Sequence, residues 1–476
     1  MSDFSLQALQ ARYGAKWRWL AVGTVMLGTI ATVLSATIIN VALPDIMQHF
    51  GIRQGQAHWM VTGFIAAMTT TMLTTGWLLD HYGLRRSLAA AMFVFTLIAI
   101  AGGFAPTPEW LIAARIGMGA VAGLMQPMAM YLVFRVFPRD MRGQAMGIYG
   151  VGVILAPALG PVIGGFIVDQ LSWRYVMFAP APVTLLGIYM VYRFLPWPVS
   201  RPAPYRFDFP GLALLALFIG PSLDALNALQ HADGQGLRIS LGAGVAIVAL
   251  ILFVLRQRHA KHPLLHLGLL QRPEFLSACL GAMALGLALF GSTYLIPLFV
   301  QSALHYSATE AGLLMLPAGI ALGITFPIAG RMADRQPARW MIMGGILAFA
   351  LSTTLFAVSD MSLGFAWLAL WAVIGRVGLG LIMPALSTGA LNPLDTDELG
   401  YGSSIINFTR QLGGAFGVNI VALTIEYGDH VNGLPTIDAF HTAWWLVTAF
   451  VLIALWPVRR IGLAGTIPAA AASAEK

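Results

Sequence analysis

The sequence predicts an all-α integral membrane protein with fourteen transmembrane helices, arranged as two six-helix bundles and two additional central helices. Hydrophobic residues make up 58% of the 476 residues, Asp, Glu, Lys and Arg together only 10%, and the apolar residues fall into long runs. Soluble proteins carry about 25% charged residues because their surfaces face water. The composition therefore excludes a soluble enzyme or a nucleic-acid-binding domain, and we expect no nucleic-acid partner.

Each helix is predicted from an apolar run that is long enough to cross a bilayer. About 20 apolar residues are needed to span roughly 30 Å of hydrocarbon. The runs are continuously apolar rather than alternating, which favours helices over a β-barrel. The first run is too long for a signal-peptide core, so we expect it to be retained. In order, the runs cover residues 19–43, 57–79, 87–105, 110–134, 144–168, 174–195, 209–229, 237–255, 275–300, 311–330, 338–358, 362–388, 399–425 and 440–458.

The uneven distribution of Lys and Arg predicts the orientation. If the N-terminus is cytoplasmic, 21 of the 27 Lys and Arg residues lie in cytoplasmic segments, and only Arg53, Arg174 and Arg238 lie in outer loops. Such an excess is typical of the cytoplasmic side. We therefore expect a multi-pass protein of the cell (inner) membrane with both termini in the cytoplasm.

Short motifs of the first half recur in the second half. Parallel repeats of this kind are typical of transporters that alternate access to a site near the membrane midplane, whereas chance matching in apolar sequence is the alternative. At offsets of 254, 261 and 257 residues, the matches are Gly76-x3-Asp80 with Gly330-x3-Asp334, Arg115-Ile-Gly-Met-Gly with Arg376-Val-Gly-Leu-Gly, and Pro127 with Pro384. The predicted parts are a cytoplasmic N-terminus (1–18), a first bundle (19–200), two central helices (201–258), a second bundle (259–460) and a cytoplasmic tail (461–476).

Several segments together resemble a known transporter family. The loop Gly76-Trp-Leu-Leu-Asp80-His-Tyr-Gly83-Leu-Arg85-Arg86 resembles the signature loop of the major facilitator superfamily. The fifth run, with Gly150-x-Gly152 and Ala156-Pro157-Ala-Leu-Gly160-Pro161-x-x-Gly164-Gly165, resembles the antiporter motif. Three further segments complete the pattern: Leu34–Pro44, which contains Asn40, the pair of central helices from Asp208 onward, and Asn407–Gly414. Taken together, residues 19 to 460 resemble the fourteen-helix drug:proton antiporter family, the EmrB/QacA-like branch.

This resemblance implies a function and a mechanism. The expected protein is a secondary transporter that exports small amphipathic compounds or drugs in exchange for protons, with the proton gradient as its energy source and no cofactor. The two bundles would rock around a central site. In a cell with an outer membrane, the resemblance also implies a periplasmic adaptor and an outer-membrane channel, although the sequence itself does not show that partnership.

The resemblance also assigns two sets of residues. The first set forms a gate on the cytoplasmic side; the alternative is that its charges only fix the orientation of the helices in the membrane. Asp334 belongs to a weaker copy of this gating loop, because no double arginine follows it. The second set belongs to a helix that lies between the two halves and resists leakage through the exchanger. Physically, this role is close to simple helix packing. The gate residues are Gly76, Asp80, Gly83, Arg85 and Arg86, and the helix residues are Pro157, Gly160, Pro161, Gly164 and Gly165.

Polar residues inside the runs predict the transport cavity, because lipid cannot pair them. A mid-membrane arginine costs roughly 2.5–3.5 kcal/mol, so Arg115, on one helical face with Gln126, should face a cavity or a partner. The resemblance ties Arg115 to proton coupling; a packing role with hydrogen bonds to carbonyls is the alternative. Asn407, Arg410 and Gln411 form a polar stripe that serves substrate or coupling, or else holds helices together. Asn40, in the first run, is a further candidate for the cavity.

Asp224 is the only acidic residue that the predicted runs place well inside a helix. A buried carboxylate can exchange protons near neutral pH, so Asp224 is our candidate for coupling. If the run shifts by one turn, Asp224 is an ordinary outer-loop charge. Two positions depart from the family pattern: Ser35 replaces a frequent acidic residue, which favours neutral or anionic substrates, and Pro180 replaces a usual asparagine.

Other chemistries have weaker support. The sequence has no G-x4-G-K-[ST] loop, so we expect no ATP hydrolysis. His259, His262 and His266 lack acidic or cysteine co-ligands, so we expect no metal site. A proton-coupled importer on the same fold is the nearest rival function. A membrane-embedded lipid-modifying enzyme would need a nucleophile or a His/Asp pair at one membrane face, which we do not find.

Overall fold

The computed structural model describes residues 6–196, 206–229, 236–360, 363–428 and 436–462, and within them it contains helices and no strands. The first half of the chain forms α1 (Leu6–Tyr13), α2 (Lys16–Phe50), α3 (Gln54–Ala57), α4 (Trp59–Met72), α5 (Thr75–Gly103), α6 (Pro108–Val136), the 3-10 turn η1 (Arg139–Met141), α7 (Arg142–Gln170), α8 (Trp173–Phe178) and α9 (Ala181–Phe194). A hairpin of α10 (Phe209–Leu229) and α11 (Gly236–His259) follows. The second half forms α12 (Leu267–Leu270), α13 (Pro273–Ser302), α14 (Ala308–Ala333), α15 (Ala338–Ala357), α16 (Phe365–Leu391), α17 (Leu399–Glu426), α18 (Thr436–Ile453) and α19 (Leu455–Val458).

The long helices follow the predicted apolar runs. In the described part of the chain, eleven helical segments are long and apolar enough to cross a membrane. Two runs are interrupted: the run 57–79 is divided between α4 and α5, and the run 174–195 is divided into α8 and α9 at Ala179 and Pro180. Gly83, with a φ of 73°, breaks the helical geometry within α5 in the predicted loop between the runs 57–79 and 87–105. Glycine tolerates this left-handed φ because it lacks a Cβ. The predicted boundary at 200–201 and most of the predicted tail, 463–476, lie outside the described residues.

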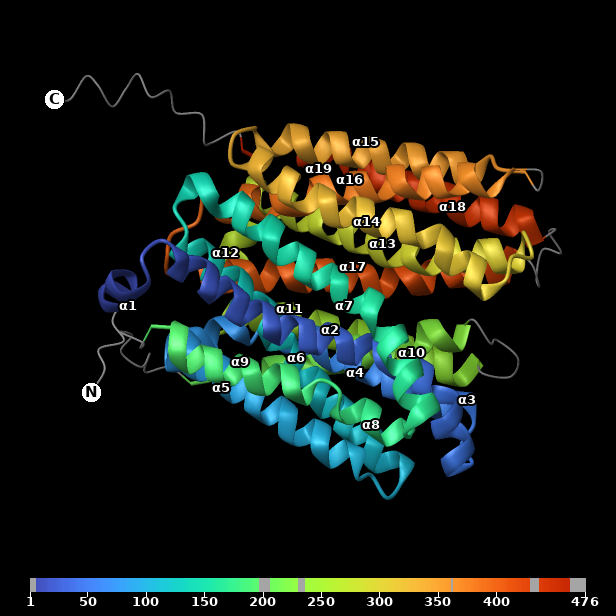
Figure 1. Ribbon diagram of the computed structural model, residues 1–476, viewed down its shortest axis with the longest axis horizontal. Helices are drawn as coiled ribbons and strands as arrows, with labels where there is room; N and C mark the ends of the chain where they lie inside the picture. The colour runs from blue at the N-terminus through green and yellow to red at the C-terminus, as the bar shows by residue number, and fades with distance from the viewer. Residues whose placement is uncertain (1–5, 197–205, 230–235, 361–362, 429–435, 463–476) are drawn as a thin grey trace.

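The two halves repeat the same helix packing. In the first half α2 packs on α7, α4 on α6 and α5 on α6; in the second half α13 packs on α17, α14 on α16 and α15 on α16. Glycines allow the closest of these approaches, since a Cβ on Gly119 or Gly413 would overlap the backbone of Phe64 or Met283. Figure 1 shows the second half, in yellow to red, above the blue and green helices of the first half.

Two seams join the halves. Along one seam, α7 of the first half packs on α14 of the second (Figure 1). Along the other, α17 of the second half packs on α4 and α5 of the first, and α10 contacts both α4 and α17. The central hairpin therefore covers the α4–α17 seam and is not a separate unit beside the bundle.

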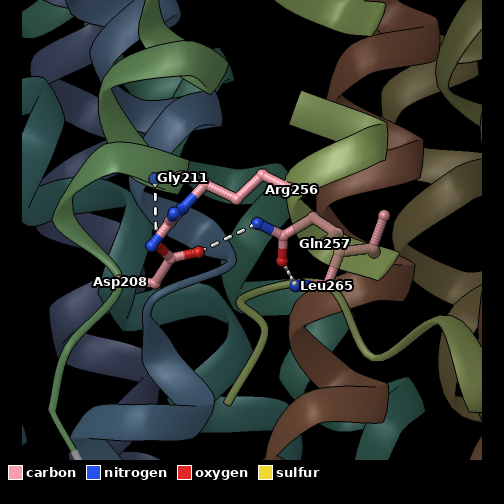
Figure 2. Close-up of polar contacts among 5 residues, drawn as sticks. All are labelled: Asp208, Gly211, Arg256, Gln257 and Leu265. Carbon is pink, nitrogen blue, oxygen red and sulfur yellow. Dashed lines mark hydrogen bonds and ion pairs between the residues drawn. The ribbon is translucent and has the colours of Figure 1, made fainter. Parts of the chain in front are cut away.

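A buried polar network fixes the base of this hairpin. Figure 2 shows Asp208 just before α10, where it accepts hydrogen bonds from the Gly211 backbone N–H at 3.0 Å and from Nε of Arg256 at 2.6 Å. Gln257 donates to the other carboxylate oxygen at 3.0 Å and accepts from the backbone N–H of Leu265 at 3.0 Å. The network thus ties the start of α10 to the end of α11 and to the segment that leads into the second half.

Candidate functional site

A cavity of about 270 Å³ opens between the two halves near one end of the bundle, which we call the His58 end. Its walls come from α4, α10, α13 and α17, so both halves and the central hairpin contribute. Most of the lining is apolar, with a few amide, imidazole and hydroxyl groups. The lining residues are His58, Val61, Thr62, Ile65, Leu223, Asn227, Phe290, Tyr294, Gln411, Gly414, Ala415, Val418, Asn419 and Ala422. We call this space the His58 cavity.

A buried polar cluster lies between α6 and α17. Nη2 of Arg410 donates to Oε1 of Gln126 at 2.7 Å and to Oδ1 of Asn407 at 3.2 Å. Nδ2 of Asn407 donates to Sδ of Met130 at 3.2 Å and to the Ser403 carbonyl at 2.9 Å. We call Gln126, Met130, Asn407 and Arg410 the Arg410 cluster. It borders a small cavity of about 20 Å³, into which Tyr149 of α7 also faces.

The structure therefore brings together most of the residues predicted for the cavity. Gln126, Asn407 and Arg410 contact one another across the two halves, and Gln411, the next residue on α17, lines the His58 cavity. No acidic side chain is among the described residues that line either space. The His58 cavity can thus accommodate an apolar body and offer hydrogen bonds, while the one cationic group, Arg410, borders the smaller cavity.

Arg115 lies elsewhere, buried between α6, α2 and α4. Its Nε donates to the Met60 carbonyl at 3.1 Å, and its Nη1 donates to the carbonyl and the hydroxyl of Ser35 at 3.1 and 2.9 Å. The guanidinium also lies 4.3 Å from the centroid of the Phe64 ring. This geometry corresponds to the alternative interpretation, a buried cation bonded to carbonyls. It also shows that Ser35, the departure from the family pattern, is a direct partner of Arg115.

The second half repeats this contact. Nη2 of Arg376 on α16 donates to Oγ1 of Thr293 on α13 at 2.9 Å. Thr293 follows Ser35 by 258 residues and Arg376 follows Arg115 by 261, within the offsets of the sequence repeat. The two halves therefore share a buried arginine that is paired with a hydroxyl group.

Two other candidates lie outside the cavities. Asp224 accepts from Nη2 and Nε of Arg238 at 2.5 and 3.0 Å, which joins α10 to α11 near the His58 end. This placement matches the alternative interpretation, a paired charge near a helix end, and not an isolated carboxylate inside the span. Asn40 on α2 is exposed and lines neither cavity.

The opposite end of the bundle, which we call the Asp80 end, is closed by contacts between the halves. The hydroxyl of Tyr401 on α17 donates to Oδ2 of Asp80 at 2.7 Å. Gly76 explains how α17 comes so close, since a Cβ there would lie 2.5 Å from the Tyr401 ring. The His266 ring contacts the same tyrosine in a tilted arrangement, with 3.9 Å between the ring centroids and 36° between the ring planes. Burial lowers the pKa of His266, whereas the nearby Asp80 and Glu398 carboxylates raise it less.

Asp334 makes the corresponding contact on the other seam. Its two carboxylate oxygens accept from the backbone N–H groups of Gly143 and Gln144, at the start of α7, at 2.6 and 2.8 Å. A carboxylate at a helix N-terminus is favourable because the free N–H groups and the helix dipole point toward it. Although the sequence marks this loop as the weaker copy, its carboxylate contacts the other half directly. Arg142 adds a bond from Nη1 to Oδ1 of Asn392 at 2.9 Å.

The remaining gate residues do not bridge the halves through the bonds described. Nη2 of Arg85 donates to the Tyr192 carbonyl at 2.8 Å within the first half. Arg86 is exposed. Gly83 provides the break in α5 that separates the helix carrying Asp80 from the next one.

The antiporter-motif helix α7 lies between α2 and α14. A Cβ on Gly160 would overlap Thr37 of α2, and one on Gly164 would overlap Ile38, whereas Gly165 faces open space. Pro157 and Pro161 are exposed. Only part of the motif therefore packs against another helix.

Comparison with known proteins identifies the family. Residues 25–418 match the Major Facilitator Superfamily. The chain belongs to the major facilitator superfamily. It is 30% identical over 396 residues to the multidrug export protein EmrB of Haemophilus influenzae, covering 83% of this chain and 78% of EmrB. It is 26% identical over 409 residues to the lincomycin resistance protein LmrB of Bacillus subtilis, covering 86% of this chain and 85% of LmrB.

Solved structures agree on the fold. The proton:xylose symporter XylE superimposes with a TM-score of 0.68 at 13% sequence identity, covering 96% of this chain and 97% of XylE. The chain's membership of the superfamily and its eleven candidate spans in the described residues indicate a multi-pass membrane transporter rather than an enzyme. In the described residues, no three His, Cys, Asp or Glu side chains gather as metal ligands would.

Sequence reasoning missed several residues of these sites. Tyr401, Asn392 and Tyr149 lie in contacts between helices that are far apart in the sequence. The sequence offered two weak signals for such contacts: a position close to the end of a membrane-spanning helix, or a hydroxyl group within an apolar run. His58 lines the cavity from the start of α4 and Tyr294 from about two turns before the end of α13, and neither position is marked as a cavity residue by the sequence.

Proposed function

We propose that this transporter exports small amphipathic compounds in exchange for protons, by alternating access. The observation that carries the proposal is the asymmetry between the two ends: a cavity opens at the His58 end, while Asp80–Tyr401 and Asp334–α7 hold the halves together at the Asp80 end. Rocking of the halves would break these contacts and close the cavity. Relatives named for multidrug export and lincomycin resistance support drug export as the direction.

We further propose fourteen crossings with both termini in the cytoplasm. Eleven described segments have the length and hydropathy needed for a span. The other three spans would be α7, α17, and α4 together with the first turns of α5. The Lys and Arg distribution then makes the Asp80 end cytoplasmic and the His58 end external. The transporter would thus be outward-open, with the parts 1–18, 19–200, 201–258, 259–460 and 461–476 as predicted.

The cavity chemistry supports roles for individual residues. The Arg410 cluster and Gln411 would hold the polar part of the substrate, and the apolar wall of the His58 cavity would hold its body. Arg115 would take part in coupling through its contacts to α2 and α4. Asp224 would be the carboxylate that receives a proton from outside. Protonation would release Asp224 from Arg238 and so loosen α10 from α11 beside the cavity residues Leu223 and Asn227.

EmrB-like relatives also support a partnership. In a cell with an outer membrane, we propose a periplasmic adaptor and an outer-membrane channel that receive the substrate at the His58 end. Co-purification of the tagged transporter with such proteins from its own cells tests this.

The function is tested with everted membrane vesicles that hold a proton gradient. Addition of an exported amphipath should release protons from vesicles with the wild type. Arg410→Gln should lose most of this signal, because the substrate would lose its cationic partner, whereas Arg258→Gln, an exposed arginine outside the cavity, should keep it. Proton release that is the same with Arg410→Gln, or absent with wild type across a broad drug panel, would contradict the proposal.

A further inference from the structure

A second and larger hollow lies on the outer surface of the second half. It has a volume of about 840 Å³ and runs between α10, α13, α17 and the α18–α19 corner. Phe218, Met283, Leu412, Phe450 and Trp456 line it, and all are apolar or aromatic. Met283, Phe450 and Trp456 are exposed, so the hollow faces the surroundings of the bundle and not the His58 cavity. We call it the Phe218 groove.

One charge marks one end of this groove. Among its described lining residues, Arg459 is the one charged side chain, and it follows α19 at the Asp80 end. The next residue, Arg460, lies 5.2 Å from the centroid of the Trp456 ring. Arg459 is exposed, and the described contacts give it no carboxylate partner. The apolar groove therefore ends at Arg459 and Trp456, and Arg460 lies beside that tryptophan.

The groove lies within the depth of one leaflet. Its lining on α13 runs from Leu280 to Leu287, which are seven and fourteen residues beyond the first residue of that helix, Pro273. At a rise of 1.5 Å per residue these positions lie about 10 and 21 Å from the start of the helix, and half of a bilayer of 40–45 Å with its headgroups is about 20–22 Å. Trp456 and Arg459 at the Asp80 end of the groove suit the headgroup level, because aromatic rings and basic pockets between helices are typical there.

We propose that the Phe218 groove binds an anionic phospholipid, with its acyl chains along α13 and α17 and its phosphate on Arg459 and Arg460. The occupant is a bilayer lipid because the apolar walls face the membrane, and it is anionic because the one charge among the described lining residues is positive. The proposal rests on the membrane orientation given above, which places this end in the cytoplasmic leaflet.

The groove lies directly behind the substrate helix. Gly413 and Gly417 of α17 pack on Met283 and Leu287 of α13 within the groove, while Arg410 and Gln411 of the same helix face inward. A lipid in this position would support the packing of the helix that carries the candidate substrate groups.

Native mass spectrometry of the full chain in detergent tests the proposal without measuring transport. With equal concentrations of phosphatidylglycerol and phosphatidylcholine, the wild type should retain phosphatidylglycerol several-fold better. Arg459→Gln should weaken this preference, because one of the two cationic partners of the phosphate is lost, whereas Arg258→Gln, an exposed arginine at the same end outside the groove, should leave it unchanged. Ala284→Phe, which fills the groove, should reduce retention of both lipids.

Three results would overturn the proposal. They are equal retention of the two lipids by the wild type, an unchanged preference in Arg459→Gln, or a stable second copy of the chain that excludes lipid from this face. Because the readout is lipid retention, failure here leaves drug export untouched, and failure of drug export leaves the lipid result standing.

Discussion

Ser35 and Arg115 show how one side chain can set the charge inside a transporter. The guanidinium is fully buried and its described partners are carbonyls and a hydroxyl, so the positive charge is solvated without being neutralised. An acidic residue at position 35 would place a carboxylate within reach of Nη1. The difference between serine and an acid is therefore a difference of one net charge in the buried interior of the first half, between α2, α4 and α6.

The first prediction follows from this pair. Ser35→Asp should shift the exported compounds toward cations and away from anions, because the interior loses one positive charge. Resistance of cells to matched cationic and anionic amphipaths, at equal expression, measures the shift. Ser35→Asn is the control of the same size without the charge, and an identical change in both variants would refute the electrostatic explanation.

Asp334 gives a prediction in pH. Burial raises its pKa above the ordinary value of 3.8, and the two backbone N–H bonds only partly oppose this. A carboxyl group with a raised pKa in the closed state favours that state at low pH, and this contribution is lost as the pH rises through the raised pKa. The contact at the Asp80 end should therefore loosen between pH 3.8 and the raised pKa.

Cross-linking of the Asp80 end across this pH window checks the prediction. The wild type should cross-link less as the pH rises, whereas Asp334→Asn, which does not titrate, should show a flatter profile. The same slope in both proteins would assign the pH dependence to another group, such as His266.

At the scale of the element, α7 illustrates which parts of a motif carry contacts. Gly160 and Gly165 belong to the same antiporter motif, yet only Gly160 packs closely on α2. Gly160→Val should destabilise the protein by about 1–3 kcal/mol through overpacking. Gly165→Val should remain close to wild type. Thermal unfolding in detergent, with drug resistance as a second readout, compares the two variants, and equal losses would show that the local geometry of α7 is wrong.

Most elements could be predicted because apolar runs record the spans directly. The runs 209–229 and 399–425 coincide almost to the residue with α10 and α17. The break between α8 and α9 was not predicted, because one proline in an apolar run gives only a weak signal. The pairing of Asp224 with Arg238 depends on the register of two helices, which a single run cannot specify.

The site could be predicted in part. The polar stripe on α17 gave Asn407, Arg410 and Gln411, since polar groups in apolar helices need partners. The contacts of Tyr401 with Asp80 and of Arg115 with Ser35 required the three-dimensional approach of separate helices, so sequence spacing alone could not reveal them.

At the scale of the whole molecule, the account predicts two ends that open alternately. Spin labels in a Cys279→Ser background, since Cys279 is the one cysteine of the chain, measure this by distance spectroscopy. One pair, at Arg139 and Thr396, spans the halves at the Asp80 end; the other, at Arg53 and Tyr427, spans them at the His58 end. All four positions are exposed.

On changing the pH or adding an exported compound, the distance between Arg139 and Thr396 should increase while the distance between Arg53 and Tyr427 decreases. Two distances that stay fixed, or that lengthen and shorten together, would contradict alternating access by rocking of the two halves.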